Sequence, residues 1–169
     1  MTKLQQMGLA AAAAFWVCAA IAAPNARVDQ AFVTQAGLSG QAEVALGKVG
    51  ETKGIEAATK VFGQTMVVEH GNANAQLAEL AAAKGLTMPT APTPADDAAI
   101  RQIAALSSDA FNVRYAAKMI ADHKKTIALF EQEAHAGRDP ELKAFAAEHL
   151  AALRHHLAMA EQLPGTPKP

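Results

Sequence analysis

Methionine, acidic and histidine residues recur in this chain at spacings that suit a metal site. Two short segments share one pattern, in which methionine is followed by two small or apolar residues, an acid and a histidine: MVVEH at 66–70 and MIADH at 119–123. In a helix, residues four apart lie on the same face. Each methionine therefore lies one turn from its own histidine, and both segments predict a helix that carries metal ligands on its inner face.

Helix geometry brings further candidates to the same depth. A helix rises about 1.5 Å per residue. Counted from the expected helix ends, His70 and His123 fall near the middle of their helices, at nearly the same height if these helices run antiparallel. His156 falls within about one turn of that layer and Glu43 within about two. We expect the sulfurs of Met66 and Met119 to flank the histidines from opposite sides.

Inward histidines from facing helices, with a carboxylate nearby, are how helical bundles build metal sites. The candidate ligands share an inward position near mid-helix: His70, His123, His156, Glu43, Met66 and Met119. Thioether sulfur favours copper(I), whereas carboxylates favour iron, manganese or zinc. The cofactor prediction is therefore a transition metal ion, with copper, iron and zinc all open.

Other polar residues take different places in this prediction. Glu69 and Asp122 directly precede their histidines and should point about 100° away, as orienting groups or as surface charges. His135 and His155 are expected to face solvent, and His149 is left unassigned.

Two other interpretations stay open. Core histidines that hydrogen-bond a carboxylate can fix helix register without binding anything, in a non-catalytic structural or interaction protein. An oxidase built on the histidine layer is the enzymatic alternative. The sequence shows no nucleophile–base pair, phosphate loop or zincin motif. Neither His70 nor His123 has a glutamate three residues before it, as di-iron bundles require.

The elements that position these residues are predicted to be helices. The chain has 169 residues, 51% of them hydrophobic, and alanine, the best helix former, dominates that fraction. Apolar periodicity predicts an up-down bundle of four helices at 28–53, 55–84, 107–136 and 139–163. A proline-rich connection at 86–95 separates the second from the third, with a short helix at 96–106.

Glycine, aspartate and proline mark the expected helix ends. Gly85 should end the second helix, and Asp96 or Asp97 should cap the short one. Asp139 and Pro140 should begin the last helix. Glycines at 37, 40, 47 and 50 predict close helix packing.

The N-terminal segment resembles a secretory signal. Lys3 precedes an apolar stretch at 7–21, and Ala20–Ile21–Ala22 suits cleavage after Ala22. The predicted organisation is a cleaved signal at 1–22, a domain at 23–163 and a disordered tail at 164–169. The apolar stretch is short for a membrane anchor, and the residues before Cys18 make a poor lipobox.

Cleavage of this segment changes the chemistry that is available. The 15 basic and 16 acidic residues give a net charge of −1, and loss of Lys3 makes it −2. The cut would also remove Cys18, the one cysteine, so the mature chain would have no thiol chemistry. We therefore expect a periplasmic protein with no stable membrane insertion. A near-neutral surface gives no basis for binding nucleic acid, and protein partners are left open.

Several stretches together resemble a bacterial ferritin-like family, catalogued as domain of unknown function 4142. They include QAEVALGK at 41–48, FGQTMVVEH at 62–70, YAAKMIADHKKTIALFEQEA at 115–134 and LRHHLAMA at 153–160. The resemblance covers about residues 30–163 and implies an exported ferritin-like bundle. Its pattern falls on the six candidate ligands and on Glu69, where the family usually has aspartate. It brings no established activity, and copper enters only by analogy with a related exported family.

Overall fold

Alanine-rich segments with apolar residues at three- and four-residue steps form the helices that the sequence predicts. The computed structural model describes residues 24–166, and every regular element within them is a helix. The helices are α1 (Pro24–Lys53), α2 (Ala57–Ala83), α3 (Pro94–Ala105), α4 (Ser108–Ala136) and α5 (Pro140–Ala160). The all-α prediction is confirmed, with five helices of which α3 is the shortest. The predicted signal at 1–22 lies outside the described residues.

Local sequence signals fix most helix ends. Gly85 follows α2 with a φ of 66°, a left-handed conformation that glycine adopts without a side-chain clash. The Asp139 side chain accepts hydrogen bonds from the backbone N–H groups of Glu141 and Leu142 at the start of α5. The predicted cap of the short helix is wrong. Thr93 caps α3, because its hydroxyl accepts the N–H of Asp96 and Pro94 takes the first helical position.

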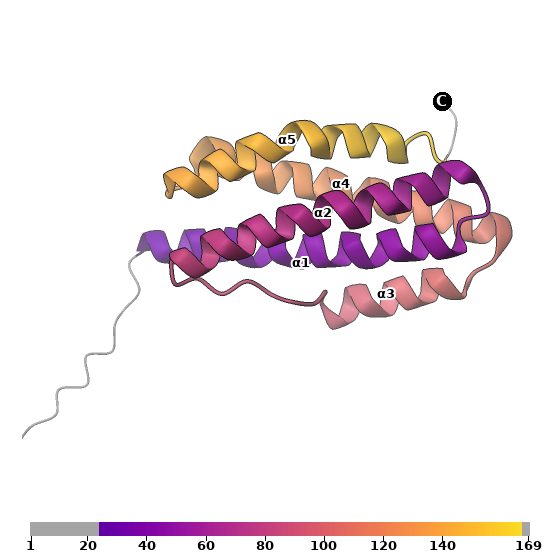
Figure 1. The fold of residues 1–169 in the computed structure, drawn as a ribbon, viewed down its shortest axis with the longest axis horizontal. Helices are drawn as coiled ribbons and strands as arrows, with labels where there is room; N and C mark the ends of the chain where they lie inside the picture. The colour runs from indigo at the N-terminus through magenta and orange to yellow at the C-terminus, as the bar shows by residue number, and fades with distance from the viewer. Residues whose placement is uncertain (1–23, 167–169) are drawn as a thin grey trace, which may run out of the picture.

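The helices pair as two antiparallel hairpins, α1 with α2 and α4 with α5 (Figure 1). Between the hairpins, the chain returns along α1 through the proline-rich connection and α3. Gln30 holds the connection to α1, since its side chain donates to the carbonyl of Thr87 and accepts from the Thr87 N–H. Because of this return, α2 and α4 run in the same direction. The prediction that these two helices are antiparallel is wrong.

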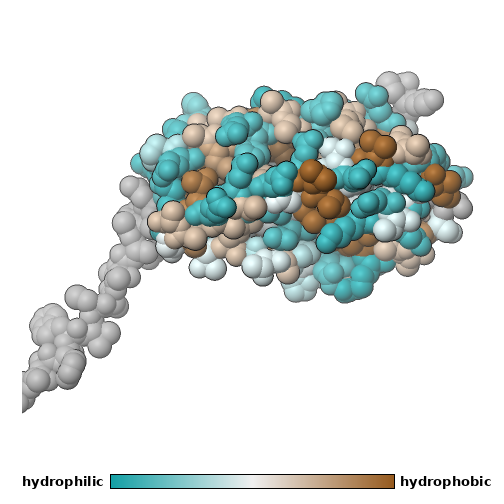
Figure 2. Space-filling model, viewed as in Figure 1, coloured by the Kyte–Doolittle hydropathy of each residue, from teal (hydrophilic) through white to brown (hydrophobic). Residues whose placement is uncertain are grey.

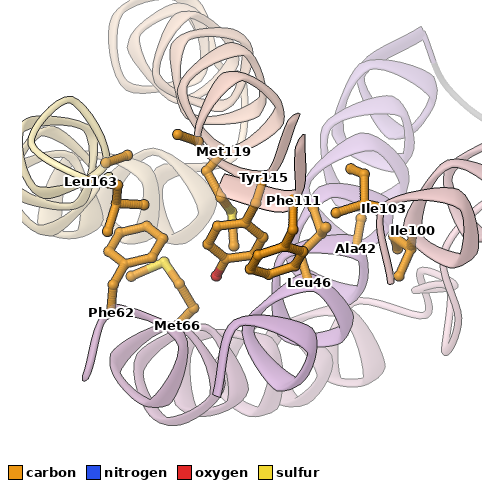
Figure 3. Packing of buried hydrophobic residues seen from close by; sticks show 12 residues of the cluster. Ala42, Leu46, Phe62, Met66, Ile100, Ile103, Phe111, Tyr115, Met119 and Leu163 are labelled. Carbon is orange, nitrogen blue, oxygen red and sulfur yellow. The ribbon is translucent and has the colours of Figure 1, made fainter. Parts of the chain in front are cut away.

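The interior contains two apolar clusters. The first gathers side chains from the C-terminal half of α1, the N-terminal halves of α2 and α4, the inner face of α3, and the end of α5 with Leu163 after it. Figure 3 shows it with Phe62, Met66, Phe111, Tyr115, Met119 and Leu163 packed together. The second lies toward the opposite ends of the same helices and includes Phe32, Leu77, Phe130, Leu142 and Phe145. The polar residues near mid-helix therefore fall between two apolar regions.

Some large apolar side chains lie on the surface. Those exposed within residues 24–166 are Val28, Ile55, Val61, Val68 and Val113. On the face in Figure 2, hydrophobic groups alternate with hydrophilic ones. Within residues 24–166, no helix has both the length and the unbroken apolar character needed to cross a bilayer.

Close approach between α1 and α2 depends on glycine. A Cβ atom at Gly63 would lie 2.5 Å from the carbonyl oxygen of Gly47, and one at Gly47 would lie 2.8 Å from the carbonyl oxygen of Gly63. Such distances leave no room for a side chain at either position. Gly71, also on α2, would meet nothing within 4 Å. The two glycines of α2 therefore serve different purposes.

This difference gives a matched pair of substitutions. We expect Gly63→Ala to lower the free energy of unfolding by about 1–3 kcal/mol, because the two backbones must separate. Gly71→Ala should raise it by about 0.5–1 kcal/mol, because alanine favours the helix. Urea unfolding followed by circular dichroism measures both. Equal effects of the two substitutions would contradict the close-packing account.

Candidate metal centre

Three buried histidines from three helices meet between the two apolar clusters. His70 comes from α2, His123 from α4 and His156 from α5, and each is at most 6% exposed. Their ring centroids lie 5.1 to 5.6 Å apart. One ligand nitrogen of each ring lies within 4.8 Å of the other two. The structure thus brings together the three histidines that the sequence singles out.

Each imidazole has one ring nitrogen engaged by a group that can only accept a hydrogen bond. Nδ1 of His123 lies 2.9 Å from the backbone carbonyl of Met119. Nε2 of His156 lies 2.9 Å from Oε2 of Glu69. Nδ1 of His70 lies 2.9 Å from Oε2 of Glu43, close but without regular hydrogen-bond alignment. Carbonyl and carboxylate oxygens accept, so these ring nitrogens carry the protons.

The other ring nitrogens are buried and have no hydrogen-bond partner within residues 24–166. They are Nε2 of His70, Nε2 of His123 and Nδ1 of His156. In a neutral imidazole the nitrogen opposite the N–H has a free lone pair. When the three rings are neutral, the partners therefore assign a tautomer to each that leaves one lone pair per histidine unused. A buried polar atom without a partner costs about 1–3 kcal/mol, and the three histidines carry one such nitrogen each.

Glu43 of α1 is the carboxylate of the centre and is fully buried. Its Oε2 faces His70, and its Oε1 lies 3.7 Å from Nδ1 of His123 and accepts a 3.3 Å hydrogen bond from Thr126. Burial raises the pKa of Glu43, but the charge and hydrogen bond of His70 outweigh it, and the pKa falls to about 2. For His70, burial lowers the pKa, but Glu43 prevails and raises it.

His156 lies in a different electrostatic environment. Burial, and then the charge of His70, lower its pKa to about 4, although Glu69 acts in the opposite direction. Its partner Glu69 is half exposed. The proton on Nε2 of His156 thus faces a carboxylate at the surface, and its Nδ1 faces the interior. His156 therefore stays neutral at physiological pH, the form in which imidazole binds metals.

The two methionines lie on the same side of the histidines. Met66 and Met119 are fully buried in the first apolar cluster, near Phe62 and Leu163 (Figure 3). The expectation that their sulfurs flank the layer from opposite sides is wrong, because α2 and α4 are parallel.

The remaining polar candidates take distinct places. Glu69 orients His156, as one of its two expected roles, whereas Asp122 pairs with Lys118 at the surface. His135 and His155 are exposed as expected. His149 is partly buried. Its ring centroid lies 4.2 Å from that of Phe145, with the two rings tilted by 34°, and its Nδ1 lies 2.9 Å from the Phe145 carbonyl.

Thr126 is the site residue that sequence reasoning missed. It is buried and donates its hydroxyl to Glu43. Its position in the sequence could have indicated this role, because a residue three after His123 lies on the same face of α4. Threonine at an apolar position is common in helices, so only the contact to Glu43 gives it a role.

One known protein family matches most of the chain. The pattern of the family described as a domain of unknown function (DUF4142) matches residues 18–163. The chain belongs to this family. No curated protein and no solved structure matches the chain. The role of this DUF4142 protein must therefore be argued from its own residues.

Replacing the buried carboxylate should change the titration of His70. In Glu43→Gln, burial acts on His70 without the opposing charge, so we expect its pKa to fall by roughly one to three pH units. Imidazole resonances followed by NMR against pH measure this shift. Glu131→Gln removes a surface carboxylate paired with Arg154 and is the control. An unchanged His70 pKa in Glu43→Gln would refute the assigned pairing.

Proposed function

We propose that this DUF4142 protein binds one transition metal ion through His70, His123 and His156. The observation that carries the proposal is the set of three buried nitrogen lone pairs, one from each helix, that no hydrogen-bond donor satisfies. A metal ion is a shared partner for all three, and imidazole is the commonest metal ligand. Core histidines that only hydrogen-bond a carboxylate leave these lone pairs unexplained.

The size of the cluster fits a single ion. Nitrogens within 4.8 Å of one another share a point about 2.8 Å or less from each. Metal–imidazole bonds are about 2.0–2.1 Å long. Movements of the rings by less than about 1 Å therefore complete the bonds, and rotation of buried side chains supplies such movements without unfolding a helix.

We assign Glu43 an orienting role beside the ligands. Its carboxylate faces the Nδ1 side of His70 and His123, opposite the nitrogens that are free to bind. Glu69 does the same for His156 from the surface. A carboxylate on the far nitrogen fixes the tautomer and makes the imidazole a stronger ligand. Its negative charge also offsets part of the charge of a buried cation.

Three imidazoles with an open fourth position suit zinc, copper or iron. Met66 and Met119 lie one turn from their histidines, on one side of the centre. Thioether ligation from either would favour copper(I). We propose that these methionines are optional additional ligands, and that ligation by either of them selects copper over the harder metals.

The wider setting is also part of the proposal. Two antiparallel hairpins joined by a long return, with ligands near mid-helix, support a ferritin-like four-helix bundle to which α3 is added. The n-region, apolar stretch and cleavage pattern at 1–22 support export to the periplasm. We propose a periplasmic metal-binding protein, with metal storage, delivery or stress protection as its task.

Metal binding by the purified mature protein tests the proposal. We expect one zinc or copper ion per chain by isothermal titration, and an affinity at least about 100-fold weaker in His70→Ala/His123→Ala. The double variant His135→Ala/His155→Ala removes the same number of histidines from the surface and should bind as the parent does.

The same variants distinguish a purely structural layer. Circular dichroism and thermal unfolding without metal show whether each variant remains folded. If the parent protein binds no metal above background, and the inner double variant only loses stability, the histidines serve the core alone. Equal loss of binding in both double variants would also overturn the assigned site.

A further inference from the structure

The histidine centre is not sealed on all sides. A cavity of about 280 Å³ lies between α2 and α5, and His70, His156 and Glu43 form part of its wall. α2 and α5 belong to different hairpins and contact each other less than the helices within each hairpin do. Small residues line the gap, among them Gly40, Ala73 and Ala152. The sequence thus leaves space beside the site where larger side chains would fill it.

Three residues of the centre that carry unpartnered polar atoms form part of the cavity wall, although these atoms themselves are buried. Nε2 of His70 and Nδ1 of His156 are buried without partners, and both residues line the cavity. Glu43 adds an Oε2 that lacks an aligned donor. His123 is absent from the lining, so it lies on the closed side of the centre. A ligand entering between α2 and α5 would therefore reach the side chains of His70 and His156 before that of His123.

The cavity wall has a definite charge. Its carboxylates are Glu43, Glu69 and Glu148, and it contains no lysine or arginine. Carboxylates in a space with low-dielectric walls attract cations and repel anions. Amides of Asn72, Asn74 and Gln76 add donors and acceptors. Phe130, Phe145 and Leu77 supply an apolar wall.

We propose that this cavity is the access route to the metal and binds a small neutral ligand that completes the metal's coordination. The proposal rests on the metal site proposed above. It adds that the fourth coordination position of the metal is open to a ligand from outside the protein. Three protein nitrogens leave a fourth position to an exogenous molecule, as in catalytic rather than structural sites. The volume admits a molecule with a handful of heavy atoms, and the carboxylates select against anions.

Cobalt(II) is a suitable probe, because its visible spectrum reports coordination at an open position. The protein as it is purified from the cell is loaded with cobalt(II). It is then titrated with imidazole, a neutral ligand, or with azide, an anion. We expect a saturable spectral change with imidazole and at least a 10-fold weaker response to azide. Equal or tighter binding of azide would overturn the assigned selectivity.

Two adjacent alanines of α5 provide matched variants. Ala152 lines the cavity, and Ala151 is exposed and does not. Ala152→Leu should keep stoichiometric cobalt binding, slow cobalt uptake and weaken imidazole binding at least 10-fold. Ala151→Leu should match the parent in all three measurements. Indistinguishable behaviour of the two variants would overturn the access route.

The outcomes separate the two proposals. If cobalt binds at one ion per chain but neither added ligand changes its spectrum, the metal site stands and the open cavity site falls. If neither cobalt, zinc nor copper binds, both fall together. Thermal unfolding of Ala152→Leu confirms that a loss of ligand binding comes from a filled cavity and not from a damaged fold.

Discussion

The structure depends on one ionised carboxylate buried among imidazoles. Glu43 is inaccessible to solvent, and burial of a charge without compensation costs several kcal/mol. The compensation comes from other helices: His70 of α2, and His123 with Thr126 of α4. Docking of the two hairpins therefore buries the Glu43 charge and at the same time supplies the partners from α4 that offset the cost. This charge couples hairpin docking to the geometry of the histidines.

The direction of the helices decides what surrounds this centre. Because the chain returns along α1 before α4 begins, α2 and α4 are parallel and their related motifs point the same way. Both methionines consequently lie in one apolar cluster, and the space on the other side of the histidines is free to open between α2 and α5. An antiparallel arrangement would have placed one sulfur on each side. The connection between the hairpins thus decides which side of the histidines holds the methionines and which side holds the cavity.

Each histidine of the centre has one ring nitrogen 2.9 Å from an acceptor oxygen and one without a partner among the described residues. A purely structural polar layer does not explain this division between the two nitrogens, because such a layer gains no stability from unused lone pairs. It is also what pre-organised metal sites show, with acceptors behind the ligands. Glu69 brings such an acceptor from the surface, so the centre is linked to solvent on the α2–α5 side. The same side holds the cavity and its carboxylates.

The sequence by itself determined the helices, their approximate ends and the depth of His70, His123 and His156. These follow from local rules: periodic apolar residues, Gly85 and Asp139 at helix ends, and a fixed rise per residue. It also indicated that glycines allow close packing, as Gly47 does against Gly63.

Only the tertiary structure decided the relative direction of α2 and α4, because local periodicity is the same for parallel and antiparallel neighbours. It also decided which nitrogen of each ring is free. That choice depends on Glu43, Glu69 and Thr126. Three of the four contacts that these residues make to the rings and to each other join residues 80 or more positions apart. Pairing over such distances is set by how the hairpins dock. The cavity beside the site has the same origin, since it is the space that docking leaves unfilled.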